Sequence, residues 1–243
     1  MAIYTDLKTG LPLNEYEESF DSAVRAGILA LTYGNYTTTI DTSKYEALPN
    51  SPGWLRRYPY DDGTSSNNEW NFTRDQLIPL VTGLSSQGHH KVVRRVLIAH
   101  LKRFLLLCQS FQHDVPGSWK YPWPHKTLER SKKGKWVLCD FPDILLPHQL
   151  FVLIKGAKLS KVLTFFCLLA SLPFFLLDLL FHAKVFKHYE ENQMFCVCAA
   201  YGKWALRLYK KLKPNWIDIN REYWYTRNEK EYADLMERWL ESE

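Results

Sequence analysis

The sequence lacks the short motifs that mark common enzymatic chemistries. Its 243 residues contain no cysteine and histidine pattern with metal-ligand spacing, no phosphate-binding loop, no dinucleotide fingerprint and no nucleophile elbow. No stretch alternates apolar and polar residues for long enough to build a sheet. These absences argue against a β-rich fold and leave no basis for assigning a cofactor or a metal, so we expect neither.

Cysteine is scarce and odd in number, with five in the chain. Cys167, Cys196 and Cys198 lie within apolar helical patterns, which is typical of buried free thiols in a reducing compartment. Residues 1–20 contain no apolar stretch, which predicts synthesis in a cytoplasm without a signal peptide. We therefore expect no disulfide framework.

Length and composition fit one folded domain spanning residues 1–243, with 46% hydrophobic and 15% aromatic residues. The net charge of +5 is unevenly distributed. Residues 89–137 carry 11 basic and 2 acidic side chains, whereas residues 1–88 carry 6 basic and 11 acidic ones. The acidic segments either neutralise the basic middle within the fold, or leave it to face phosphate, anionic lipid or an acidic partner.

Apolar residues recur at three- and four-residue spacing along most of the chain, which predicts helices. Thr73 and Gln76 have capping-box spacing, so one helix should begin at Arg74, with Pro79 beyond its first turn. We predict further helices at 14–33, 89–112, 147–159, 160–188 and 190–212, and a last one after Asn228. The expected fold is all-α, an irregular multi-helix bundle or a partial α/α toroid with long ordered loops.

The apolar run at residues 162–183 is the most informative feature of the sequence. Its only formal charge is Asp178, and as a helix it would span roughly 33 Å, enough for the hydrocarbon core of a bilayer. We place this helix at the centre of the core, with Pro173 as a kink and Asp178 paired to a buried group. Two alternatives stay open: a helix or bent hairpin that lies in one leaflet, and a helix that spans the bilayer.

The segment from Trp54 to Gln76, which begins within the first long loop (residues 35–72) and ends just beyond it, gathers carboxylates among aromatic side chains. Glycoside hydrolysis needs two carboxylates across a cleft, and sugar rings stack on aromatic faces. The candidate catalytic residues are Asp61, Asp62, Glu69 and Asp75. Carboxylates in such a loop also serve as helix caps and solvated surface groups. A glycan-active hydrolase is therefore our alternative hypothesis and not the preferred one.

The second long loop, residues 114–143, interleaves aromatic and basic side chains. Such a surface suits single-stranded nucleic acid or the headgroup layer of an anionic membrane, and equally a rigid flap packed on the fold. The candidate binding residues are Trp119, Lys120, Tyr121, Trp123, Arg130, Lys132, Lys133, Lys135 and Trp136.

Two stretches resemble a known group of proteins: W-N-F-T-R-D-Q-L-I-P-L, from Trp70 to Leu80, and D-I-L-L-P-H-Q, from Asp143 to Gln149. They are similar to uncharacterised helical proteins encoded by tailed phages and some bacteria. That family has no established activity, so the resemblance implies only a phage or bacterial setting and a virion role.

We therefore expect a non-enzymatic binding or assembly protein, associated with a virion or peripheral to a membrane. Its basic and aromatic middle would contact a polyanion such as nucleic acid, an anionic membrane surface, a protein partner or a second copy of the chain. Under the alternative reading, the ligand would be a glycan.

Overall fold

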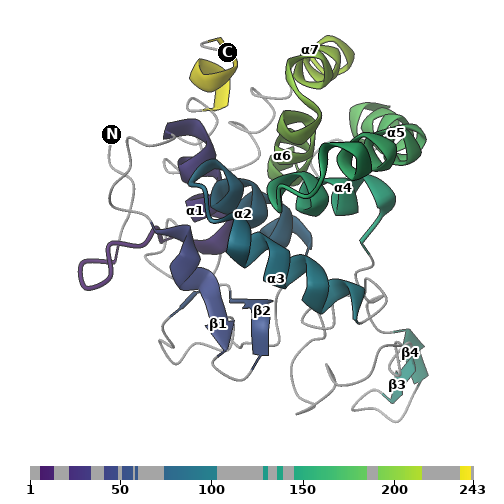
Figure 1. Cartoon of the computed structure of the whole chain (residues 1–243). Coiled ribbons are helices and arrows are strands. Elements are labelled where there is room, and N and C mark those ends of the chain that lie inside the picture. Colours follow the sequence, from purple (N-terminus) through teal and green to yellow (C-terminus); the bar gives the residue numbers. More distant parts are fainter. Residues whose placement is uncertain are drawn as a thin grey trace.

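The computed structural model describes residues 6–13, 22–33, 41–48, 51–56, 58–59, 74–102, 128–130, 136–138, 145–184, 191–214 and 236–241. Most of them are helical, so the fold is all-α, as the apolar spacing predicts (Figure 1). The α-helices are α1 (Ser22–Tyr33), α2 (Arg74–Ser86), α3 (His90–Leu101), α4 (Pro147–Gly156), α5 (Lys161–Lys184), α6 (Glu191–Tyr201) and α7 (Lys203–Leu212). Residues 236–241 are also helical.

The segments predicted as long loops each contain a short antiparallel hairpin. Within 35–72 lie the 3-10 helix η2 (Thr42–Tyr45) and the strands β1 (Glu46–Leu48) and β2 (Ser51–Leu55). Within 114–143 lie β3 (Leu128–Arg130) and β4 (Trp136–Leu138). An ion pair joins the first hairpin to the helices, because the Arg95 guanidinium of α3 contacts the Glu46 carboxylate of β1.

Helices α1 and α2 cross at a distance that only small residues allow. A Cβ atom on Gly27 would lie 2.2 Å from the Pro79 carbonyl, and one on Gly83 would lie 2.8 Å from the Gly27 Cα. The Ser86 hydroxyl donates a 2.9 Å hydrogen bond to the Ala30 carbonyl across the same pair. The crossing leaves α2 buried over most of its length, in contact with α1, α3, α4 and α6.

Side chains of α3 close the C-terminal end of α4. Arg94 donates hydrogen bonds of 2.7 and 3.0 Å to the carbonyls of Ala157 and Lys158. His90 Nδ1 lies 2.8 Å from the Gly156 carbonyl. These contacts satisfy carbonyl groups that the last turn of a helix leaves without an intrahelical donor.

The single helix predicted over 190–212 is two helices, α6 and α7. Gly202 separates them with φ at +104°, a left-handed value that favours glycine and interrupts the helix. The apolar spacing continues on both sides of this break, which is why the pattern alone predicts one helix. Cys196 and Cys198 of α6 are buried, as predicted, whereas Cys167 of α5 is only half-buried.

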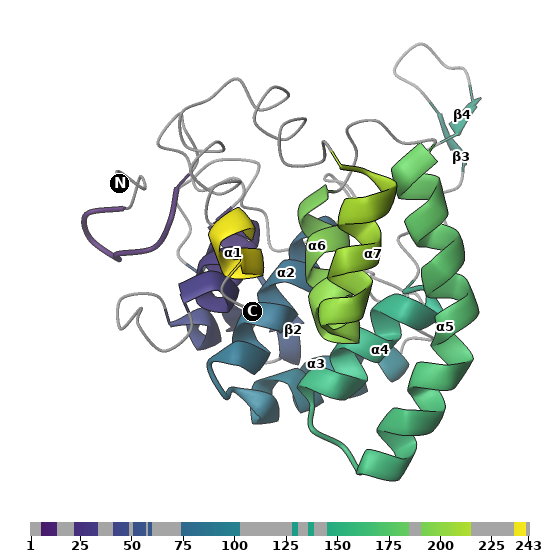
Figure 2. The same cartoon turned by 90° about the horizontal axis from the view of Figure 1, so that it is seen from above.

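Helix α5 forms where the sequence predicts it, but its expected position at the centre of the core is wrong. The helix lies along one edge of the molecule, against α4, α6 and α7 (Figures 1 and 2). Only 17% of its most apolar 18-residue window is buried. Since α1, α2, α4 and α6 already fill the core, only one side of α5 packs on the protein.

Replacing Gly27 with alanine should lower the free energy of unfolding by about 2–3 kcal/mol, because the methyl group would meet backbone that cannot move aside. The control is Gly88→Ala, where open space leaves only the cost of a left-handed φ, about 1 kcal/mol. Urea unfolding followed by circular dichroism measures both changes. Equal losses would contradict the close α1–α2 crossing.

Candidate functional site

Between its terminal lysines, the exposed side of α5 is entirely apolar. The middle of this side is a line of residues spaced by three and four: Val162, Phe166, Leu169, Pro173, Leu177 and Leu180. We define the α5 apolar face by its large exposed side chains, which are Val162, Leu163, Phe165, Phe166, Leu169, Phe174, Leu176, Leu177, Leu180 and Phe181. Lys161 and Lys184, both exposed, stand at its two ends.

The α5 apolar face is large for a surface in contact with water. Its four phenylalanines are each about half exposed. At roughly 200 Å² per aromatic side chain, they alone leave about 400 Å² of apolar area accessible. Six aliphatic side chains of the same face add to this area. The largest apolar patch on a typical soluble monomer is about 300–600 Å², so this face exceeds the ordinary range.

Ser171, Asp178 and His182 of α5 point the other way, into the protein. The Tyr201 hydroxyl of α6 donates a 2.5 Å hydrogen bond to Ser171 Oγ. Asp178 Oδ2 lies 3.0 Å from Nε2 of His148 on α4, and Asp178 Oδ1 lies 3.9 Å from Nε2 of His182 one turn further on. The helix is therefore inverted relative to a surface helix of a soluble protein, which turns its apolar stripe toward the core.

The Asp178 carboxylate is stabilised in its charged form. Burial acts first and by itself would raise its pKa, but the contacts outweigh burial and the pKa lies below its usual value. The contact with His148 contributes most to this lowering, followed by the charges of His182 and Arg74. Asp178 is thus paired with groups inside the protein and adds no charge to the α5 apolar face.

Trp204 of α7 lies at the edge of α5. Its ring meets the buried Phe175 ring edge to face, with the centroids 5.7 Å apart, and is itself 46% exposed. Phe175 in turn stacks on Tyr201 at 4.1 Å. A half-exposed indole beside an apolar surface presents both an apolar body and an N–H donor, a combination that suits an interface between oil and water.

Of the four predicted catalytic residues, the structure describes Asp75 alone. Asp75 lies half-buried in the first turn of α2, where the helix dipole favours a negative charge. Asp61, Asp62 and Glu69 lie outside the described residues. The carboxylate cleft therefore stays a prediction.

The predicted binding residues of the second loop fall mostly outside the described residues. Arg130 and Trp136 are opposite each other in the β3–β4 hairpin, and their side chains are not described. The others are Trp119, Lys120, Tyr121, Trp123, Lys132, Lys133 and Lys135, none of which lies in a described range.

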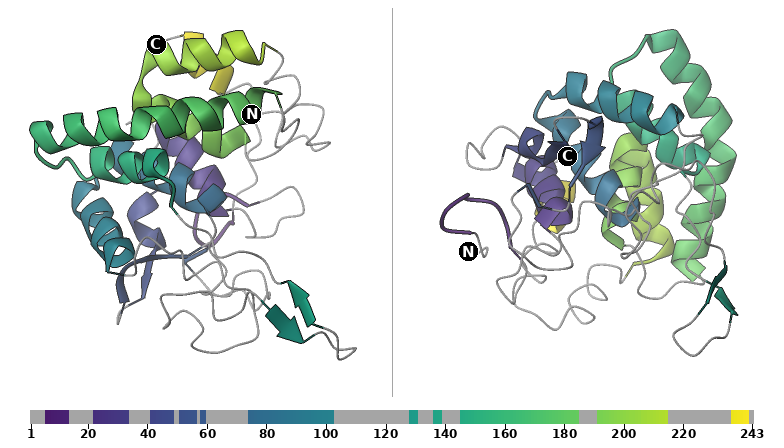
Figure 3. Two further views of the ribbon diagram at one scale, coloured as in Figure 1. Left: turned by 90° about the vertical axis from the view of Figure 1, so that its right-hand side faces the viewer. Right: turned by 90° about the horizontal axis from the view of Figure 1, so that it is seen from below.

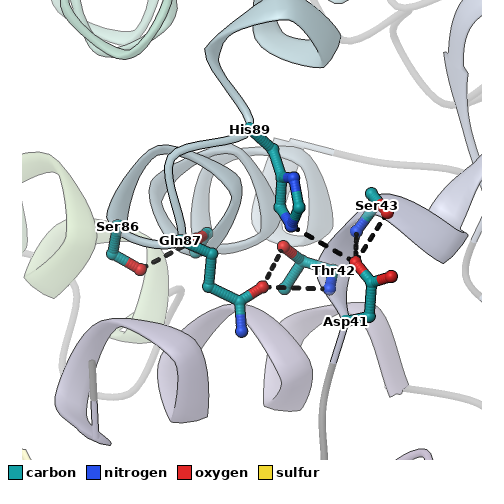
Figure 4. A network of polar contacts seen from close by, with 7 residues as sticks. Asp41, Thr42, Ser43, Ser86, Gln87 and His89 are labelled. Carbon is teal, nitrogen blue, oxygen red and sulfur yellow. Dashed lines mark hydrogen bonds and ion pairs between the residues drawn. The ribbon is translucent and has the colours of Figure 1, made fainter. Parts of the chain in front are cut away.

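A second polar cluster joins η2 to the turn between α2 and α3 (Figure 4). The Thr42 backbone N–H and hydroxyl both donate to Gln87 Oε1, at 3.0 and 2.6 Å. Asp41 accepts from Ser43 and lies 3.2 Å from His89 Nε2. The polar groups of this cluster bond to one another across two backbone segments. We therefore interpret the cluster as structural, holding η2 against the turn between α2 and α3.

Across the described ranges, no three His, Cys, Asp or Glu side chains come together as a metal site requires. The same ranges contain one helix, α5, that is long and apolar enough to cross a membrane by length and composition. No family model, curated protein or solved structure matches the chain. The resemblance to phage-encoded proteins therefore stays a prediction.

One signal in the sequence indicates which side of α5 is buried. The polar residues of the run, Thr164, Ser171, Asp178 and His182, follow one another at steps of seven, seven and four, which places them on a single side of a helix. Sequence reasoning treated the run as hydrophobic all round and missed this stripe. The stripe predicts the inward side, and with it the apolar outward side.

Replacing Asp178 with asparagine should lower the free energy of unfolding at pH 7 by about 1–3 kcal/mol, because His148 loses a charged partner inside the protein. The lowered pKa fixes the sign of the pH dependence: the stabilisation is present above the unfolded pKa of about 3.9 and disappears as the pH falls through the folded pKa. Urea unfolding of both proteins between pH 7 and pH 2.5 tests this. A difference that stays constant over that range would contradict the charged pairing.

Proposed function

We propose that the protein is a peripheral membrane protein that lies on a lipid bilayer and inserts the α5 apolar face into one leaflet. The observation that carries this proposal is the inversion of α5, whose polar side chains contact α4 and α6 while its large apolar side chains face outward. A helix with one apolar side in the acyl region and the other covered by protein matches the physics of interfacial helices.

The packing of α5 favours a helix in the plane of the membrane over one that crosses it. Its inner side is committed to α4, α6 and α7 (Figure 3). Crossing the bilayer would carry these neighbours with it, yet α4, α6 and α7 have only 10, 11 and 10 residues. A helix needs about 20 apolar residues to span the hydrocarbon core, and the charged ends of shorter helices would be left inside it.

Charge favours a membrane over a second copy of the chain as the occupant of this face. In a parallel α5–α5 pair, Lys161 would face its counterpart, and in an antiparallel pair it would face Lys184. The neighbouring α7 contains four basic residues and no acidic one, so it offers such a dimer no compensation. Basic ends beside an apolar face match the negative surface of a membrane.

This proposal narrows the binding or assembly role expected from the sequence and moves the contact from the second loop to α5. A phage or bacterial origin and a virion role remain part of the proposal without further support. The glycan hydrolase remains an alternative that depends on Asp61, Asp62, Glu69 and Asp75.

Charging the middle of the α5 apolar face should abolish vesicle binding. We expect the purified chain to float with phosphatidylcholine vesicles in a density gradient at high salt. Phe166→Glu combined with Leu177→Glu should weaken this binding by roughly 100-fold or more, because each carboxylate would enter the acyl region. Circular dichroism shows whether the variant remains helical.

The matched control is Ile98→Glu combined with Leu101→Glu, which charges two apolar residues of α3 that are 50% and 51% exposed. This variant should float like the unchanged chain. If the unchanged chain stays at the bottom of the gradient and light scattering shows a dimer that Phe166→Glu and Leu177→Glu dissociate, the face binds a second copy and the membrane proposal is wrong.

A further inference from the structure

Helix α7 places a basic arc next to the α5 apolar face. The α7 sequence, K-W-A-L-R-L-Y-K-K-L, buries Ala205, Leu206 and Tyr209 on one side. Its exposed side carries Lys203, Trp204, Arg207, Lys210 and Lys211. At 100° per residue these five exposed positions fit within about 120° of the helix circumference, so they form one continuous surface.

Trp204 fixes how this basic arc is oriented toward α5. The indole touches Phe175 of α5, so the edge of α7 that contains Trp204 lies at the seam between the two helices. Arg207 and Lys211 follow Trp204 at three and seven residues, which keeps them on the same edge. Positive charge and a half-exposed indole therefore border the apolar face on the side of α7.

We infer that the α7 arc gives the docked protein a preference for anionic phospholipids, with Arg207, Lys210 and Lys211 contacting the headgroups. This inference rests on the proposed insertion of α5 and adds the class of lipid. Trp204 would lie at the boundary between acyl chains and headgroups, and the basic side chains would lie beyond it, in the headgroup layer.

The position of the arc favours lipid over other polyanions. A nucleic acid or an acidic protein bound to α7 alone would leave the adjoining α5 apolar face in water. An anionic bilayer occupies both surfaces at once, with acyl chains against α5 and headgroup phosphates against α7. A bilayer is thus the partner whose layers match the order of the two helices.

Reversing the charge of the arc separates this inference from the insertion of α5. Near an anionic surface each basic side chain strengthens binding by roughly fivefold. Arg207→Glu combined with Lys211→Glu should therefore weaken binding to vesicles of phosphatidylcholine with phosphatidylglycerol by about 25-fold or more at low salt. Binding to pure phosphatidylcholine vesicles should not change, and high salt should remove the difference between the two lipids.

The control is Lys91→Glu combined with Lys102→Glu, which changes the net charge equally through exposed residues in the first turn of α3 and just after its end. Helix α4 lies between α3 and α5 (Figure 3), so these residues are not next to the α5 apolar face. Circular dichroism of both variants checks folding, and the control should retain the binding of the unchanged chain to anionic vesicles.

Three results would overturn the inference, and each is distinct from failure of the proposed function. Full binding of Arg207→Glu and Lys211→Glu to anionic vesicles would remove α7 from recognition while leaving α5 insertion intact. If the α3 control weakened binding to anionic vesicles equally, the loss of binding would come from net charge alone and not from the position of the arc. Binding of the unchanged chain to a single-stranded oligonucleotide in preference to anionic vesicles would assign the arc to nucleic acid. Absence of binding to any vesicle would instead refute the proposed function.

Discussion

The pairing of Asp178 with His148 is the constraint on which the outward face of the protein depends. A helix as apolar as α5 gains similar free energy from burying any of its sides, so hydrophobicity alone does not fix its rotation about its axis. An ionised carboxylate does, because it is stable away from water only beside a partner. His148 is fully buried on α4 and supplies that partner, which turns the side with Asp178 inward.

The rest of the fold provides a platform on which this pairing can form. The close α1–α2 crossing at Gly27 and Gly83 puts α2 at the centre, where it contacts α4 and α6. Those two helices present the partners of the α5 polar stripe, His148 on α4 and Tyr201 on α6. Contacts from α3 then hold the end of α4 from which the chain leads into α5. The glycines at the α1–α2 crossing thus determine where the polar side chains of α5 find their hydrogen-bond and ion-pair partners.

Periodicity and caps in the sequence predict most of the described helices. The predicted start at Arg74 is confirmed, and the apolar run at 162–183 matches α5 within one residue at each end. The break at Gly202 could not be predicted, because apolar spacing continues across it and a mid-helix glycine is often tolerated. The position of α5 was predicted wrongly, since length and hydropathy are the same for a core helix and a membrane helix. The seven-residue spacing of its polar residues held the missing information.

In the proposed docking, α5 and α7 contribute two different kinds of attachment to the bilayer. Insertion of a helix side into a leaflet is driven by apolar area and is indifferent to headgroup charge, whereas basic side chains recognise charge but lose their attraction in salt. In the proposed docking, insertion of α5 is enough to hold the protein on a neutral bilayer, and the basic arc strengthens binding where the headgroups are anionic. The exposed phenylalanines of α5 and the lysines and arginine of α7 occupy neighbouring strips joined by Trp204, so under the proposed function one docking event would engage both. The α5 apolar face costs free energy in water; under the proposed function insertion into a leaflet would recover that cost, and anionic headgroups would add their attraction to the basic arc.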